Sequence, residues 1–62
     1  MTYYLMSSAE LVRRFKIVSS DLLAFKEDSD LLASERALGI ADSLYVLEQL
    51  TAEMKSRGMR VP

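Results

Sequence analysis

The chain has 62 residues, half of them hydrophobic, and its eight basic and nine acidic side chains leave a formal net charge of −1. It contains no His, Cys or Trp. These absences exclude a disulfide scaffold, a structural zinc site of the usual kind and any mechanism that needs a catalytic His or Cys. The balanced charge gives no electrostatic reason to expect binding to nucleic acid or to an anionic membrane.

No apolar run approaches the roughly 20 residues of a membrane span, and the N-terminus lacks the pattern of a secretory signal. We therefore expect a cytoplasmic protein without a cofactor.

A compact chain of this mass buries only about 60% of its unfolded surface, so a lone core gives little net stability. Oligomerisation is expected on these grounds alone.

Residues 1–6 are predicted to form a short extended segment, because this stretch contains aromatic and β-branched side chains. The segment is too short to be stable alone and must dock on the rest of the chain. We expect Tyr3, Tyr4 and Leu5 to cover the end of the second helix.

The first helix is predicted over about residues 8–26. Ser7 can cap it, and Glu10 can reach back to the Ser7 amide in a capping box. Met6 and Leu11 form the matching hydrophobic staple. Apolar residues then recur at spacings of four and three along one face, here called the seam: Leu11, Phe15, Val18, Leu22 and Phe25.

Five polar residues at 26–30 interrupt this pattern, and a second seam begins out of phase with the first. The break favours a turn, in which Asp28, Ser29 or Asp30 caps a second helix over about residues 30–57. One continuous helix with a stutter is the alternative. The second seam comprises Ala33, Ala37, Ile40, Leu44, Leu47, Thr51 and Met54.

The two seams pair if the helices fold back antiparallel about Ser29, which places Phe25 opposite Ala33 and Phe15 opposite Leu44. The predicted fold class is therefore all-α, an antiparallel helical hairpin.

Two glycines have specific places in this hairpin. Gly39 in mid-helix costs about 1 kcal/mol relative to Ala, for which close approach of another helix or a local bend would compensate. Gly58 can end the second helix in the left-handed conformation, with Met59 beside Met54.

A hairpin leaves apolar side chains unused, and two hairpins can bury them in a four-helix bundle. We therefore predict that residues 1–62 form a single domain that dimerises. The predicted interface consists of Leu38, Ala41, Tyr45, Glu48, Ala52, Val12, Ile17 and Leu23.

Glu48 interrupts the apolar stripe of the second helix and has no basic partner one turn away. The antiparallel register brings Arg14 near it, so an Arg14–Glu48 ion pair is one interpretation. A polar residue that sets the register of the dimer is the other.

Two further charged clusters are interpreted as solvated surfaces. The acidic run at 27–30 lacks the glycine of a calcium loop. The basic cluster at 13–16 is diluted by acidic residues.

Two functions are compatible with these features. The first is a non-enzymatic interaction protein, a regulator, adaptor or antagonist that binds itself and another protein. The second is a dimeric DNA-binding regulator, because a short strand followed by two helices resembles the order of elements in ribbon–helix–helix proteins. Residues 2–6 contain no Lys, Arg, Asn or Gln to read base edges, and both helices are long for that family, so this is the alternative.

Overall fold

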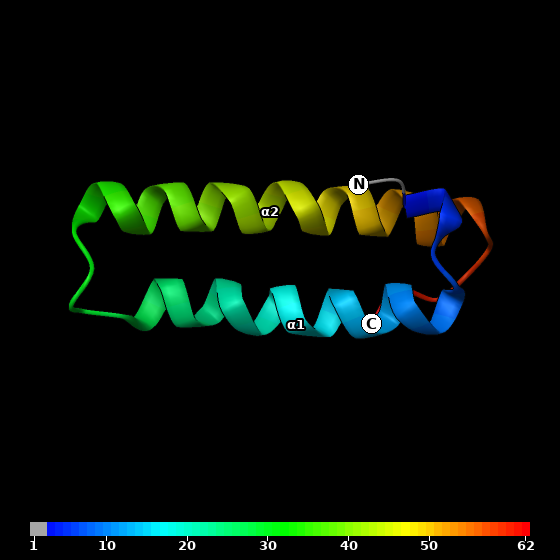
Figure 1. Ribbon diagram of the computed structural model, residues 1–62, viewed down its shortest axis with the longest axis horizontal. Helices are drawn as coiled ribbons and strands as arrows, with labels where there is room; N and C mark the ends of the chain where they lie inside the picture. Colours follow the sequence, from blue (N-terminus) through cyan, green and yellow to red (C-terminus); the bar gives the residue numbers. More distant parts are fainter. Residues whose placement is uncertain (1–2) are drawn as a thin grey trace.

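The computed structural model describes residues 3–62, which form an antiparallel helical hairpin of 38 × 17 × 14 Å (Figure 1). Helix α1 spans Ser8–Glu27, helix α2 spans Ala33–Ser56, and a short 3-10 helix, η1, spans Tyr3–Leu5. The two long helices pack against each other, and η1 contacts α2. The all-α hairpin is confirmed, and the alternative of one continuous helix is wrong.

The extended segment predicted for residues 1–6 is wrong where the structure describes it; the first two residues lie outside that description. The amide of Met6 donates to the carbonyl of Tyr3 at 3.1 Å, which closes the single turn of η1. Tyr3 packs against the core as expected, whereas Tyr4 and Leu5 are exposed. Within residues 3–62 no strand forms, so the order of elements that resembles ribbon–helix–helix proteins is not observed there.

The core lies at the end of the hairpin that carries the chain termini. Leu11, Leu50 and Met54 are its fully buried hydrophobic residues. Partly buried apolar side chains pack around them: Tyr3, Met6, Val12, Phe15, Val46, Met59 and Val61. Met6 packs against the cluster that contains Leu11, which agrees with the predicted staple.

The start of α1 follows its sequence signal in part. Ser7 is the N-cap, and its hydroxyl oxygen accepts from the amide of Glu10 at 3.1 Å. The carboxylate of Glu10 binds Arg13 and Arg14 one turn further along instead of reaching back to the cap. The cap is therefore confirmed, while the carboxylate takes the charged partners that helical spacing places beside it.

None of the polar turn residues caps α2, which begins three residues later than predicted. The Asp28 carboxylate instead accepts from the amide of Asp30 at 2.9 Å and stabilises the turn itself. At the start of α2 the carboxylate of Glu35 accepts from the amide of Leu32 at 3.1 Å. Arg36 donates to the carbonyl of Asp28 and joins the first turn of α2 to the end of α1.

The face of α2 that meets α1 is rotated from the predicted seam. Ser43 and Leu50 are buried on it, whereas Ala33, Ala37 and Leu44 are exposed. The longer turn changes which residues lie opposite each other across the hairpin. Because two apolar repeats can slide past each other, their spacing alone did not determine this choice of face.

The layer that pairs Phe25 with Ala33 is also wrong, since Phe25 packs on Gly39. A Cβ atom at Gly39 would lie 2.5 Å from two carbon atoms of the Phe25 ring. The close approach expected at Gly39 is therefore confirmed, and the neighbour is α1 of the same chain. The missing side chain makes room for the ring near the turn.

Gly39→Ala is expected to destabilise the hairpin, although alanine is the better helix former by about 1 kcal/mol. Overpacking against Phe25 costs about 1–3 kcal/mol, so the net loss should be about 1 kcal/mol. In a Phe25→Ala background the same substitution should stabilise the fold by about 1 kcal/mol. Urea unfolding of the four chains measures both effects. Equal destabilisation in the two backgrounds would show that the ring does not exclude the methyl group.

The C-terminal end of α2 closes as the sequence predicts. Gly58 has a φ of 72°, which favours glycine. Its amide donates to the carbonyl of Lys55 at 3.0 Å, and the amide of Met59 donates to the carbonyl of Met54 at 2.9 Å. This pair of bonds is the Schellman motif, and it brings Met59 against the core that contains Met54.

Arg57, the residue before this glycine, joins three elements. Its Nε donates to the Glu53 carboxylate at 2.8 Å, within α2. Its Nη2 donates to the carbonyls of Tyr3 and Tyr4 at 3.2 Å each, and its Nη1 donates to the Ser8 hydroxyl at 3.4 Å. The guanidinium therefore holds η1 and the start of α1 against the end of α2.

Arg57→Ala should lower the free energy of unfolding by about 1–3 kcal/mol, the usual contribution of hydrogen bonds to a charged group. Arg60→Ala is the matched control, because Arg60 is exposed and forms no ion pair within residues 3–62. Its effect should stay within about 0.5 kcal/mol. Chemical denaturation followed by circular dichroism compares the two variants, and equal losses would contradict the role given to Arg57.

Candidate functional site: the exposed apolar surface

Large apolar side chains remain at the surface of the hairpin. Leu38, Tyr45 and Leu44 of α2 are 67%, 63% and 51% exposed, and Leu23 of α1 is 55% exposed. The accessible surface is 4490 Å², whereas a compact monomer of this mass would expose about 4000 Å². The elongated hairpin therefore leaves more surface uncovered than a compact fold of the same chain.

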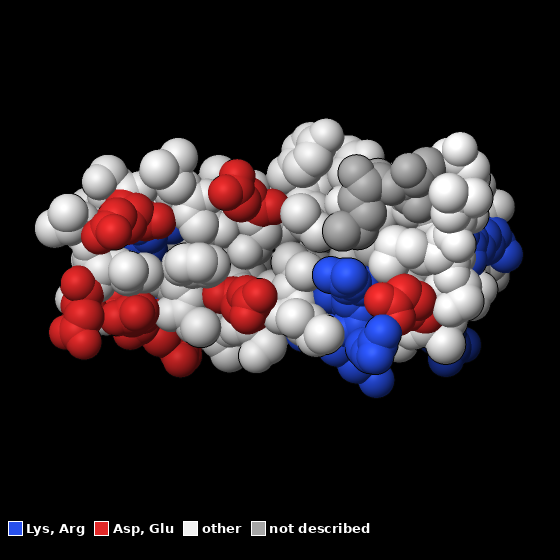
Figure 2. All heavy atoms as spheres, viewed as in Figure 1, with Lys and Arg blue, Asp and Glu red and all other residues white. Residues whose placement is uncertain are grey.

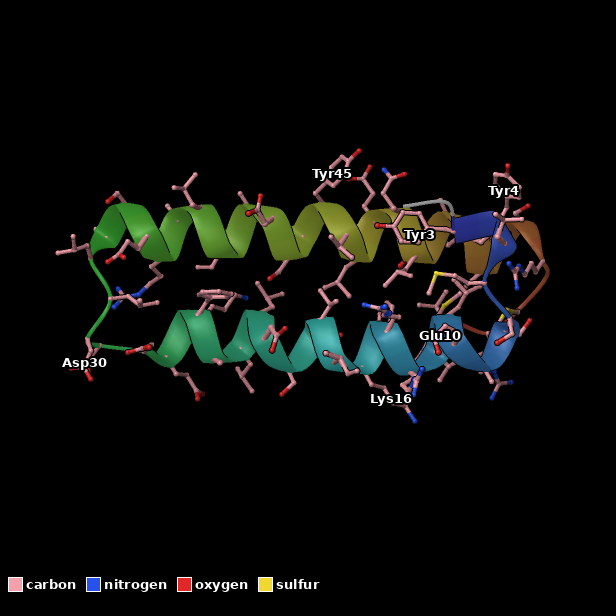
Figure 3. The ribbon with its side chains drawn as sticks, in the orientation of Figure 1. Tyr3, Tyr4, Glu10, Lys16, Asp30 and Tyr45 are labelled. Atoms are coloured by element: carbon pink, nitrogen blue, oxygen red, sulfur yellow. The ribbon has the colours of Figure 1, made fainter. Side chains whose placement is uncertain are left out.

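Four residues of the predicted interface form one stripe along α2, here called the outer stripe: Leu38, Ala41, Tyr45 and Ala52. Their spacings of three, four and seven residues place them on one side of the helix. All four are exposed. Tyr45 projects from α2 away from α1 (Figure 3). The structure therefore brings these predicted residues together on the side of α2 that α1 does not cover.

A shallow groove of about 420 Å³ extends this surface toward α1. Its lining consists of Phe15, Leu44, Leu47, Glu48, Thr51, Ala52 and Lys55. Val12 and Leu23 continue the same side of α1, since they lie eleven residues, or about three helical turns, apart and Val12 is one turn from Phe15. We call this side of the hairpin the groove face. It contains Glu48, Ala52, Val12 and Leu23 of the predicted interface.

Two predicted interface residues are placed differently from the rest. Ile17 is 52% exposed, but helical spacing places it beside Arg14 and Asp21, on another side of α1 from Leu23. Val12 is half-buried and packs against the hairpin's own core. The structure therefore separates Ile17 from the other predicted interface residues, and it gives Val12 a contact within the chain.

The Arg14–Glu48 ion pair is not formed. Nε of Arg14 donates to Oε1 of Glu10 at 3.3 Å, because Glu10 lies one turn away on the same helix and Glu48 lines the groove on the other side. Glu48 is exposed and forms no ion pair within the described chain. A register-setting role for Glu48 in a dimer stays a prediction.

The surface offers apolar contact more than reactive groups. Among residues 3–62 no cluster of three or more acidic side chains is arranged to hold a metal ion. Neither long helix has the length and apolar character needed to cross a membrane. A second hollow, lined by Asp21, Ala24, Phe25 and Asp28, brings two carboxylates near an aromatic ring.

A comparison of the chain with protein-family models, curated proteins and solved structures finds no significant match.

One groove residue was assigned to the wrong surface by the sequence. Leu44 was placed in the seam, whereas it is exposed and lines the open groove, while Phe15 lines the groove and also packs against the core. The position of Glu35, three residues after Leu32, is the signal that could have found the later start of α2, because that spacing lets a carboxylate accept from the cap amide.

A pH measurement tests the charged contacts at the start of α1. The hydrogen bond from Arg13 lowers the pKa of Glu10, with a further contribution from Arg14 and an opposing effect of desolvation. A carboxyl group whose pKa is lowered by folding stabilises the fold above its unfolded pKa and loses that contribution as the pH falls through the folded pKa.

Glu10→Gln should therefore reduce stability slightly at neutral pH, since the group is exposed and screened by solvent. The difference between the two chains should shrink as the pH is lowered to about 3. Urea unfolding at several pH values measures this difference. A difference that grows toward acid pH would contradict the lowered pKa.

Proposed function

We propose that the chain is a non-enzymatic interaction module that binds other protein chains through its exposed apolar surface. The role of such a module is that of a regulator, adaptor or antagonist of a partner protein. One observation carries the proposal: Leu38, Leu44 and Tyr45 stay exposed on a helix that has already buried another side against α1. Contiguous exposed apolar surface on a small chain is typical of a protein-binding site.

The distribution of side chains around α2 supports this reading. A helix that is apolar on more than one side packs on more than one neighbour. Within the hairpin α2 has one long neighbour, α1. The groove face and the outer stripe adjoin each other through Glu48 and Ala52, so another pair of helices could cover both and form a four-helix bundle.

The groove also indicates the shape of the bound element. An amphipathic helix presents apolar side chains at spacings of three and four to a groove between two helices. Leu44 and Leu47 offer apolar contact along the groove, while Glu48 and Lys55 bring charge to it. Tyr45 beside the groove is the kind of aromatic residue that contributes most to binding at protein interfaces.

The experiment compares the native chain, immobilised on a support, with the double variant Leu38→Ser/Tyr45→Ser. The native chain should retain protein chains, either its own purified copy or a protein from a cell extract, and the double variant should retain them at least about tenfold more weakly. The far-ultraviolet circular dichroism of the variant should match that of the native chain at high concentration, because both side chains lie outside the core.

Ile17→Ser is the matched control, since Ile17 is also apolar and more than half exposed but lies away from the groove face and the outer stripe. It should retain partners as the native chain does. If the native chain retains nothing that the double variant loses, the proposed function is wrong. If Ile17→Ser weakens the retention of partner chains as much as the double variant does, the binding surface does not lie at the outer stripe and the groove face.

A further inference from the structure

We propose that Met6 and Met59 form a redox-sensitive closure of the core, which a peroxide opens by converting their thioethers to sulfoxides. Both residues lie at the end of the hairpin that carries the chain termini, here called the terminal end. The inference goes beyond the proposed function, because neither methionine belongs to the groove face or to the outer stripe. Two features of the chain support it, the placement of its methionines and the absence of Cys.

Three of the four methionines of the chain lie in its small core. Met54 is fully buried, whereas Met6 and Met59 are partly buried and pack against the cluster that contains it. The remaining one, Met1, lies outside the described residues. Met6 and Met59 therefore stay open to a small molecule in the solvent, while Met54 is shielded.

The two partly buried methionines belong to the segments that close the core. Met6 follows η1, and its amide donates to the carbonyl of Tyr3 at 3.1 Å. Met59 lies in the Schellman motif, where its amide donates to the carbonyl of Met54 at 2.9 Å. Arg57 joins the same two segments through its bonds to the carbonyls of η1. Losing the apolar contact of either methionine therefore weakens the closure of the whole terminal end.

The composition of the chain directs an oxidant to this end. Cysteine thiolates and methionine thioethers are the usual sites of reversible oxidation in proteins. The chain contains no Cys, so every sulfur atom of residues 3–62 belongs to Met6, Met54 or Met59. A peroxide therefore acts on the terminal end of the hairpin and leaves the described residues of the turn unchanged.

The reaction consumes one hydrogen peroxide for each sulfur. A lone pair of the thioether sulfur attacks one peroxide oxygen, so that an S–O bond forms and the O–O bond breaks. The departing hydroxide takes the proton of the transferred oxygen and leaves as water. Sulfur is oxidised by two electrons, and the peroxide is reduced. A methionine sulfoxide reductase reverses the change: a dithiol is oxidised to a disulfide, and the oxygen leaves as water.

The product does not fit the core. A sulfoxide oxygen accepts hydrogen bonds, whereas the fully buried neighbours Leu11 and Leu50 offer only hydrocarbon. Burying a polar group without a hydrogen bond is unfavourable, so the oxidised side chains move into the solvent and the segments that carry them leave the core. Met54 then becomes accessible, and oxidation proceeds from the outer methionines to the inner one.

The effect arises in the core and not at the charged surface. A sulfoxide carries no net charge, so oxidation leaves the distribution of charged side chains as it is. Figure 2 shows that distribution, with acidic side chains gathered toward the turn and basic ones toward the terminal end. A change of stability on oxidation therefore reports the closure of the core.

Peptide mass spectrometry during treatment with hydrogen peroxide tests the order of oxidation, with free methionine as the rate reference. Met6 and Met59 should react at rates within about tenfold of the reference. Met54 should at first react at least about tenfold more slowly than either, because a buried side chain reacts only through local opening. Oxidation of Met54 as fast as Met59 from the start would overturn the proposed order.

Thermal unfolding at a fixed protein concentration tests the closure itself. Once Met6 and Met59 are oxidised, the midpoint of unfolding should fall by about 5–15 °C. It should return to its original value after treatment with methionine sulfoxide reductase and a dithiol. An unchanged midpoint after complete oxidation of both residues would overturn the proposal.

The double variant Met6→Leu/Met59→Leu is the matched control, since leucine has a similar volume and no sulfur. The same peroxide treatment should leave its midpoint unchanged and its Met54 unoxidised. Met1 is present in both chains, so its oxidation does not affect the comparison. Each single variant should lose part of the native shift, which keeps the test independent of the folding of the double variant. A native-sized shift in all three variants would contradict the role of Met6 and Met59.

Discussion

Each long helix of a two-helix hairpin has only one long neighbour, so it can bury only one side of its surface. That limit explains the main features of this protein. Leu11, Leu50 and Met54 are its fully buried hydrophobic side chains, while residues as large as Leu38 and Tyr45 stay exposed. The hairpin is stabilised within itself by a small core, and the apolar side chains left over define the surface on which its function is proposed to depend.

The two ends of the hairpin are held by different interactions. At the terminal end the core is closed by the turn at Gly58 and by Arg57, whose guanidinium binds backbone carbonyls of η1. Toward the turn the Phe25 ring packs on Gly39, and Arg36 binds the carbonyl that ends α1.

Local signals in the sequence predicted much of this fold, and long-range ones predicted less. The cap at Ser7 and the closure at Gly58 depend on residues a few positions apart, so the sequence was sufficient to place them. The face of α2 depends on the length of the turn, and the apolar repeat is compatible with more than one register. As a result, Ser43 is buried against α1, whereas Leu44 of the predicted seam is exposed. The residues of the outer stripe could be placed together on one exposed side of α2 because helical spacing alone defines that side. Their role as an interface stays a prediction. The Arg14–Glu48 ion pair, in contrast, depended on the register between the two helices.

The central claim is that one hairpin leaves its apolar surface for a second chain to cover. Thermal unfolding at two protein concentrations about a hundredfold apart tests it most directly. Because a partner that binds only the folded state stabilises it by mass action, the midpoint of unfolding should rise with concentration. A midpoint that does not change between the two concentrations would contradict self-association through this surface.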